Sequence, residues 1–303
     1  MKKSGCNPNV NVGVFYFDGE MMKRILLVIL CLVSVFASPR DSNGSDTKYQ
    51  RIISLAPSTT EILFALGLDE QIVAVTTFCN YPSEALSKES VGTVTQPDIE
   101  KIIFLKPDII LTTGLEQAFA VERLRQLKLN IHVSDPSNVE ELFASISTIA
   151  ELTHRENEAK GLIARMKREI NEIRQKTKLI PEGKRKKVFI EIWHDPLITA
   201  GQGSFVDELI DMAGGINIAH DVTRPYTYFS AEQLIKRDPD CIILGHIAED
   251  KIMDAIKKRL GWSKISAVKN NHIYGDVNPD IFLRPGPRLA EGLRKIYKRI
   301  YPQ

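Results

Sequence analysis

The chain has 303 residues, of which 43% are hydrophobic and 26% are charged, and its formal net charge is +2. This composition is typical of a globular protein and excludes an intrinsically disordered chain. The near-neutral charge gives no argument for nucleic-acid binding or for electrostatic attachment to a membrane. The length is sufficient for two domains of ordinary size.

The N-terminal region predicts export from the cytoplasm. A basic stretch at 22–24 precedes thirteen apolar or small residues at 25–37. A basic start, a short apolar run and small residues at its end indicate a signal peptide over 22–37, with cleavage after Ala37. The apolar run is shorter than an ordinary membrane span, and a retained anchor is the alternative.

Two further segments near the N-terminus carry no predicted fold. Residues 1–21 resemble no targeting element, and we interpret them as lying upstream of the true start of translation. Residues 38–49 are polar and contain glycine and serine, which is typical of a flexible tether.

The cysteines and histidines predict no metal site. Cys79 and Cys241 remain after the predicted processing, and because they fall in different halves of the chain we expect two unpaired thiols. No two of the six histidines have the spacing of metal ligands on one helix. No serine or cysteine nucleophile motif is present, and no pair of carboxylates indicates catalysis. We therefore expect neither a bound cofactor nor an enzyme.

The first half alternates short apolar strands with helices, which predicts a parallel α/β sheet. We assign residues 50–152 to an N-terminal lobe. The expected strands are 51–56, 71–75, 109–112 and 131–133, and the expected helices are 61–66, 97–105, 118–127 and 137–152, the last opened by a capping box at Ser137 and Glu140.

Residues 153–178 predict one long amphipathic helix. Their apolar residues recur at steps of three, four and seven, which places them on one face. Thr153 and Glu156 have the spacing of a capping box that would begin this helix. At 1.5 Å per residue it would extend roughly 35–40 Å. We expect it to join the two lobes as a rigid connection.

The second half repeats the pattern of the first, and we assign residues 184–303 to a C-terminal lobe. Strands are expected at 187–193, 241–244 and 272–274, and helices at 205–212, from 230 and from 284. Ser204 and Asp207 indicate an ordinary N-cap rather than a phosphate-binding loop. Two spacings recur in the same order in both halves: Glu61 to Gly67 with Glu208 to Gly214, and Glu100 to Pro107 with Glu232 to Pro239.

Two similar lobes predict a ligand site in the cleft between them, at the carboxyl ends of the strands. Several loops after strands concentrate aromatic residues, which favours a broad apolar ligand with stacking faces. Burial in the core is the alternative for some of them. The candidates are Phe78, Tyr81, Trp193, Tyr226, Tyr228 and Phe282.

Glu100 and Glu232 each occupy the first turn of an expected helix, one in each lobe. A carboxylate in that position is favoured by the helix dipole, which is worth about 0.3–1 kcal/mol. The alternative is that the two exposed charges dock onto basic residues of a partner protein. The residues alone leave both interpretations open.

Taken together, these stretches resemble the substrate-binding proteins of ABC importers, in the class whose two lobes are linked by one helix. The similarity runs over about residues 51–300 and is carried by RIISLAPSTTEILFALG, NYPSEA, IEKIIFLKPDIIL, TAGQGSFVDELIDMAGGINI, YFSAEQLIKRDPDCIIL and RPGPRLAEGL. This class carries cobalamin, haem and iron–siderophores. The resemblance implies a monomeric periplasmic protein that delivers a small-molecule ligand to a permease with its ATPase at the inner membrane.

Within this class the chain is most similar to the cobalamin-binding members. That resemblance implies that Glu100 and Glu232 dock onto permease arginines, and that Asp280 and Arg284 orient the ligand. A family tryptophan in the cleft is replaced by Val94 here. Cobalamin or a related corrinoid is therefore the expected ligand, and haem or an iron–siderophore, whose carboxylates Arg224 and Arg284 could bind, is the alternative.

A third alternative is an exported α/β enzyme that uses an Asp/His pair, for which His194 and His220 are the candidates. A single helical connection also predicts a small movement of the lobes on ligand binding, because it offers few loop residues to absorb a large rotation.

Overall fold

The structure is a computed structural model that describes residues 48–114, 118–246 and 255–302. The predicted signal peptide, the upstream segment and most of the tether lie outside the described residues. Within the described ranges, no helix combines the length and apolar character that crossing a bilayer requires.

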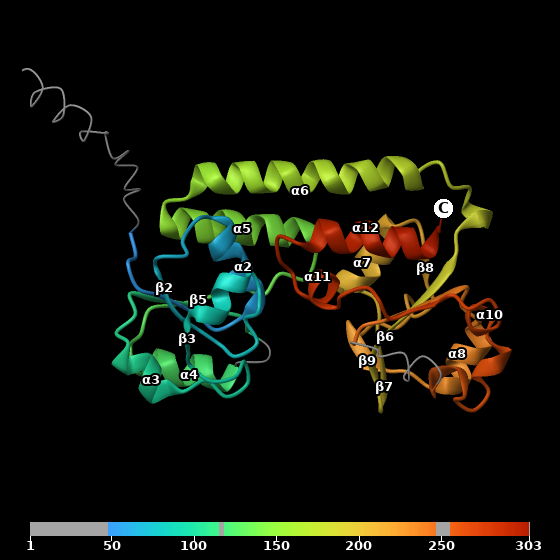
Figure 1. Ribbon diagram of the computed structural model, residues 1–303, viewed down its shortest axis with the longest axis horizontal. Coiled ribbons are helices and arrows are strands. Elements are labelled where there is room, and N and C mark those ends of the chain that lie inside the picture. Colours follow the sequence, from blue (N-terminus) through green and yellow to red (C-terminus); the bar gives the residue numbers. More distant parts are fainter. Residues whose placement is uncertain (1–47, 115–117, 247–254, 303) are drawn as a thin grey trace, which may run out of the picture. The chain divides into compact units, whose positions relative to one another are not determined.

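The first half forms a parallel sheet, as predicted, with a fifth strand, β3, that the sequence did not predict; the strand order is β3-β2-β1-β4-β5. Helices lie on both faces of it, which is why the central strands β1 and β4 are buried along their whole length (Figure 1). The strands are β1 (Ile52–Ser54), β2 (Ile72–Val75), β3 (Glu89–Ser90), β4 (Ile109–Thr112) and β5 (Ile131–Val133), and the helices are α2 (Pro57–Ala65), α3 (Ile99–Phe104), α4 (Ala118–Gln126) and α5 (Val139–Thr153).

The second half forms a six-stranded mixed sheet, in which β8 lies beside β6 and the other strands follow the order β11-β10-β6-β7-β9. The strands are β6 (Lys187–His194), β7 (Leu197–Ala200), β8 (Ile216–Asn217), β9 (Tyr226–Tyr228), β10 (Cys241–Leu244) and β11 (Ile273–Tyr274). The helices are α7 (Phe205–Met212), α8 (Ala231–Arg237), α10 (Ser266–Lys269), α11 (Asp280–Leu283) and α12 (Leu289–Ile300). The antiparallel strand β7 and the strand β9 were not expected, because the sequence predicted a loop over the tyrosines.

The two halves share one topology once this extra ribbon is set aside. Strands β2-β1-β4-β5 correspond to β8-β6-β10-β11, with the same parallel pairings. The Pro-Asp pair has the same structural role in both. Asp108 donates its backbone N–H to the Arg51 carbonyl at 2.8 Å and accepts the Arg51 N–H at 2.9 Å. Asp240 makes the same two bonds with Lys187, at 2.8 and 2.9 Å.

The long helix is α6 (Glu156–Thr177), and its predicted start is wrong. Thr153 belongs to the last turn of α5, where its hydroxyl donates to the Ile149 carbonyl at 2.7 Å, so it cannot cap α6. The chain breaks at His154, whose left-handed conformation ends α5. The apolar stripe is correct, since Ala159, Leu162, Met166, Ile170 and Ile173 are buried. Helix α6 packs along both α5 and α12 (Figure 1).

Two of the other predicted caps can be compared with the structure. Ser204 caps α7 as predicted, accepting the Asp207 N–H at 3.1 Å. The cap of α5 is Asn138 instead of Ser137, because the Asn138 side chain accepts the Glu141 N–H. In the opposite direction, the Glu141 carboxylate accepts hydrogen bonds from both the backbone N–H and the hydroxyl of Ser137.

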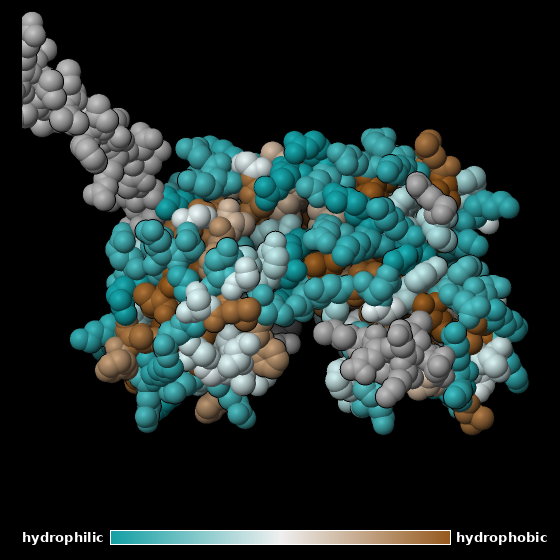
Figure 2. Space-filling model, in the orientation of Figure 1, coloured by the Kyte–Doolittle hydropathy of each residue, from teal (hydrophilic) through white to brown (hydrophobic). Residues whose placement is uncertain are grey.

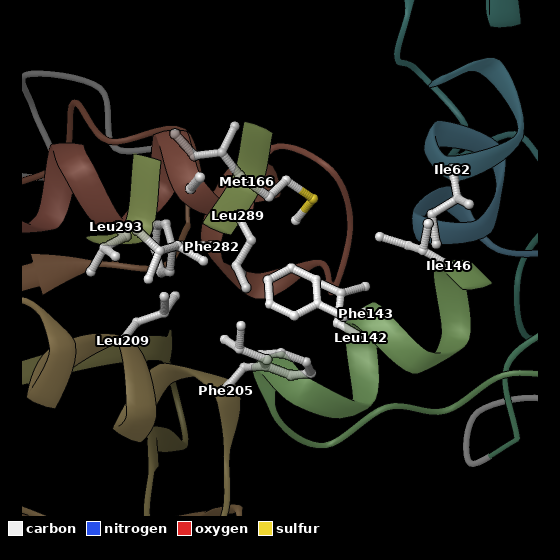
Figure 3. Close-up of a cluster of buried hydrophobic side chains, with 14 of the residues drawn as sticks. Ile62, Leu142, Phe143, Ile146, Met166, Phe205, Leu209, Phe282, Leu289 and Leu293 are labelled. Carbon is white, nitrogen blue, oxygen red and sulfur yellow. The ribbon is translucent and has the colours of Figure 1, made fainter. Parts of the chain in front are cut away.

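The hydrophobic core is continuous between the two halves. One buried cluster contains residues of both: side chains of α5 from the first half belong to it together with side chains of α7, α11 and α12 from the second. Figure 3 shows Phe143 of α5 close to Leu289 of α12 and Phe205 of α7. Apolar packing of this kind opposes sliding of the halves, because a shift would open voids.

Candidate functional site

Exposed aromatic side chains are contributed by both halves. In the first half, Phe78 and Tyr81 follow β2 and are 55% and 45% exposed. In the second, Trp193 at the end of β6 is 47% exposed, while Tyr226 and Tyr228 of β9 are 50% and 74% exposed. Large aromatic rings left in water indicate a surface that something else covers.

The unexpected ribbon explains how three of these rings share a face. Trp193 lies opposite Ile198 of β7, and Ile198 lies opposite Tyr228 of β9. Tyr226 is two residues from Tyr228 on the same strand. Residues paired across neighbouring strands, or two apart on one strand, are on the same face of a sheet. The second half therefore presents Trp193, Tyr226 and Tyr228 together.

The prediction for Phe282 is wrong. Its side chain is fully buried in α11 and belongs to the core between the halves. The sequence placed it before the C-terminal helix, but a short helix forms there and turns the ring inward. Val94, where the family resemblance implied a tryptophan, is also buried. Neither residue can stack on a ligand in this structure.

Asp280 and Arg284 contact residues of the first half directly. Arg284 donates to the Asn80 side-chain oxygen at 2.7 Å and pairs with Asp280 at 2.8 Å. Asn80 in turn donates to Asp280 at 3.0 Å. Arg284 also lies 3.6 Å from the Glu61 carboxylate. These two predicted ligand residues are thus held against the loop that carries Phe78 and Tyr81.

Glu61 and Arg288 extend this contact, and sequence reasoning gave neither a place at the site. The nearly buried Glu61 carboxylate accepts two bonds from Arg288, at 2.6 and 2.8 Å. Burial works against the Arg288 charge, but the hydrogen bonds and charge of Glu61 outweigh it, so the pKa of Arg288 is raised. The Arg288 guanidinium also lies 3.9 Å from the centre of the Tyr81 ring.

The charges of this cluster balance. Its two guanidiniums, Arg284 and Arg288, face two carboxylates, Asp280 and Glu61. Each arginine already donates to a carboxylate, so its positive charge is largely compensated before any anionic ligand binds. Arg224, the other cation considered from the sequence, is exposed.

Glu100 and Glu232 occupy equivalent positions in the two halves. They lie in the first turns of α3 and α8, after the N-caps Asp98 and Ser230. Both are exposed, and neither makes an ion pair with another described residue. Beside Glu100, Ile103 and Phe104 are also exposed, and hydrophobic surface is visible in the region of α3 (Figure 2). Their position suits contact with a partner as well as the helix dipole.

The cysteines agree with the prediction, since Cys79 and Cys241 are both buried and free. Among the residues that the structure describes, no group of three or more His, Cys, Asp or Glu side chains could hold a metal ion. Of the proposed Asp/His pairs, His220 bonds to Asp207, at 3.0 Å, instead of to its neighbour Asp221, which pairs with Arg237.

The sequence also missed a buried charged group in the second sheet. Glu191 of β6 is fully buried, pairs with Arg259 at 2.5 Å and accepts from His246 at 2.9 Å. These three residues are far apart in the chain. Glu191 and His246 come together because β6 and β10 pair in parallel, a contact for which the sequence offers no local signal, and Arg259 joins them from the segment that follows β10.

Known proteins of related sequence and fold are transport proteins. An uncharacterized ABC transporter substrate-binding lipoprotein of Bacillus subtilis (strain 168) is 37% identical over 84% of this chain and 80% of its own length. A solved structure of a possible iron-binding (periplasmic solute-binding) protein from Staphylococcus epidermidis is 35% identical, with a TM-score of 0.74 over 84% of this chain and 99% of that one.

Two proteins of Vibrio cholerae match the fold equally well. The periplasmic vitamin B12-binding protein is 28% identical, with a TM-score of 0.73 over 83% of this chain and 96% of that one. The periplasmic haem-binding protein is 25% identical, with a TM-score of 0.73 over 84% and 99%. Equal scores for two ligands mean that the fold does not decide the ligand. The model of the periplasmic binding protein family matches residues 52–278, and the chain belongs to that family.

Proposed function

We propose that this protein is the substrate-binding component of an ABC importer in the periplasm, and that it carries cobalamin or a related corrinoid to its permease. The observation that carries the proposal is the pairing of exposed aromatic rings, from both halves, with the charge-balanced cluster around Glu61 and Arg284. Aromatic faces suit a broad, flat ligand. Vitamin B12 and haem, which the two Vibrio cholerae relatives bind, are both ligands of this shape.

The balance of charge favours the corrinoid. Haem carries two carboxylates that need cationic or hydrogen-bonding partners when they leave water. The corrin ring carries mainly neutral amides, which can exchange bonds with Asn80 and Asp280 without adding charge. Because Arg284 and Arg288 already face carboxylates, a dianionic ligand would have to break an ion pair to be neutralised there.

Calorimetric titration with cyanocobalamin, haemin and a ferric hydroxamate siderophore tests the ligand. We expect saturable binding of cyanocobalamin, weakened when Trp193 or Phe78 is changed to alanine, because each substitution removes a stacking face. The control is Trp262→Phe, since Trp262 is buried in the hydrophobic core of the second half. Saturable binding of haemin with no heat from cyanocobalamin would assign the protein to haem transport instead.

We also propose that Glu100 and Glu232 contact basic residues of the permease when the ligand-bound protein docks onto it. Changing both to alanine should abolish uptake by cells while leaving the ligand affinity unchanged, since both lie on outer helices. A matched control is Glu158→Ala with Glu172→Ala, which removes two exposed charges from α6. Normal uptake by the first double variant would rule out the docking role.

The proposal places the mature protein outside the cytoplasm, following cleavage after Ala37. Sequencing the N-terminus of the protein isolated from the cell envelope checks the cleavage. A retained N-terminal segment would instead indicate an anchored binding protein. Either result leaves the ligand assignment unaffected.

A further inference from the structure

Two short helices, one in each half, correspond to each other residue for residue. Helices α3 and α8 both lie on the side of the molecule away from α6 (Figure 1). The N-cap of α3 is Asp98 and that of α8 is Ser230, and each precedes the exposed glutamate of its helix by two residues. Two residues after each glutamate a side chain is fully buried, Ile102 in α3 and Leu234 in α8. The outward faces of the two helices can therefore be compared position by position.

The side chain one turn after the glutamate is apolar in one half and charged in the other. Phe104 follows Glu100 by four residues and is 80% exposed. Lys236 follows Glu232 by four residues and is also exposed. Residues four apart on a helix lie on the same face. Each glutamate consequently shares its outward face with a different neighbour, an aromatic ring in the first half and an ammonium group in the second.

The fold does not require an apolar residue at position 104. Ile102 supplies the core contact of α3, and the equivalent helix carries a lysine in the place of Phe104. Ile103 adds to the apolar surface, since it is 44% exposed, whereas its counterpart Ile235 packs partly against the core of the second half. Figure 2 shows hydrophobic surface in the region of α3. Neighbouring exposed apolar side chains of this kind indicate a surface that a partner covers.

The charge beside Phe104 indicates the chemistry of that partner. Lys101 pairs with Glu89, and Glu100 makes no ion pair with another described residue, so its negative charge is uncompensated. An anionic lipid surface would repel this carboxylate. A second copy of the chain that docked through the same face would bring like charges together. A protein surface with an apolar pocket beside a basic residue complements both Phe104 and Glu100.

We propose that Phe104 is the apolar anchor of the contact with the permease, and that it enters a pocket next to the basic residue that binds Glu100. The second half has Lys236 at the equivalent position and offers no such anchor, so the permease holds the first half more tightly. This inference rests on the proposed docking by Glu100 and Glu232. It adds an aromatic side chain with polar neighbours, which is the composition typical of the centre of a protein interface.

Binding of the purified protein to its permease in nanodiscs of neutral lipid tests the anchor. Phe104→Ser should weaken docking by at least about tenfold, because it removes the ring without adding charge. Phe104→Leu should restore most of the affinity. The matched control is Leu179→Ser, since Leu179 lies just after α6 and is 83% exposed. Lys236→Ser should weaken docking by no more than about fivefold, as for an exposed ion pair.

A photoreactive side chain at the same position identifies what covers it. Phe104→p-benzoylphenylalanine, irradiated together with membranes that contain the permease, should give an adduct whose peptides belong to the permease. Leu179→p-benzoylphenylalanine is the control and should give none. Adducts formed only with lipid or with a second copy of the chain would overturn the proposal. Wild-type docking by Phe104→Ser, or an equal loss with Lys236→Ser, would overturn it as well.

Failure of this inference is distinguishable from failure of the proposed function. If Phe104→Ser docks normally while the double variant Glu100→Ala with Glu232→Ala does not, the anchor is wrong and docking by the glutamates stands. If the wild-type protein does not bind the permease at all, both are overturned. Calorimetry with cyanocobalamin or haemin, whichever the wild type binds, should give Phe104→Ser the wild-type affinity. A loss there would mean that the substitution acts on the ligand site, which contradicts the proposal.

Discussion

The two halves of this protein share a frame but differ in what they add to it. Each has four corresponding parallel strands. In each, the aspartate that follows a proline makes the same pair of hydrogen bonds to the residue at the start of the first strand. The second half then inserts β7 and β9, and with them two of the exposed tyrosines. The repeated part therefore supports the fold, whereas the candidate site is built largely from the parts that are not repeated.

The halves also hold each other through equivalent residues. Glu61 of α2 reaches Arg288 in the second half, and Glu208 of α7 accepts the Val139 N–H at the start of α5 in the first half. The two glutamates occupy the same place in the repeat, six residues before Gly67 and Gly214. Four predictions, in order of decreasing expected effect, test how far this correspondence extends.

The largest effect is expected at Glu191, where the halves differ most. Glu191→Ala should lower the free energy of unfolding by about 3–5 kcal/mol, because Arg259 is left without its carboxylate. Combining Glu191→Leu with Arg259→Leu gives this position the apolar character of Leu55, its counterpart in the first half, and should recover most of that loss. Urea denaturation measures both. A double variant as unstable as the single one would show that the sheet itself depends on the charge.

The next effect is expected at Glu61. Glu61→Ala should cost about 3 kcal/mol, since it removes the carboxylate shared by Arg284 and Arg288. Thermal unfolding monitored by circular dichroism measures the change. Glu84→Ala, at an exposed position on the same half, is the control and should have little effect. Equal unfolding temperatures for the two variants would contradict the assignment of Glu61 as a contact between the halves.

A smaller effect distinguishes the two equivalent glycines. Both have left-handed backbones, with φ of 70° at Gly67 and 75° at Gly214, so alanine at either should cost roughly 1–2 kcal/mol. A Cβ at Gly67 meets nothing within 4 Å, whereas at Gly214 it would be 3.0 Å from Thr177 of α6. Gly214→Ala should therefore be the more unstable by about 1 kcal/mol. Identical chemical denaturation curves would mean that α6 yields to the added methyl group.

The smallest effect is a pH dependence at Glu208. Burial raises the pKa of this carboxyl, so the folded state binds its proton more tightly than the unfolded state does. The resulting contribution to stability is full below the unfolded pKa and is lost as pH rises through the folded pKa. Relative to wild type, Glu208→Gln should gain stability as the pH rises above the unfolded pKa of a glutamate, about 4.3. Denaturation midpoints measured at a series of pH values would oppose the prediction if the difference stayed constant.

Much of the frame was predictable from the sequence because its signals are local. Alternating apolar runs predicted the parallel strands, the stripe of α6 predicted its buried face, and Ser204 was correctly identified as a cap. The errors also have local causes. Thr153 and Ser137 each fit a capping pattern, but a neighbouring residue or the preceding helix took the position instead.

For the candidate site, the amino-acid sequence was enough to predict the aromatic loops, the equivalence of Glu100 with Glu232, and the family resemblance. The burial of Phe282 in the core, the pairing of Glu61 with Arg288, and the contact of the His194 and His246 rings became apparent only in the folded structure. The two kinds of interaction differ in range. Helix caps and hydrophobic periods act within a few residues, whereas ion pairs and ring contacts between separate strands depend on sheet register and on how the halves pack.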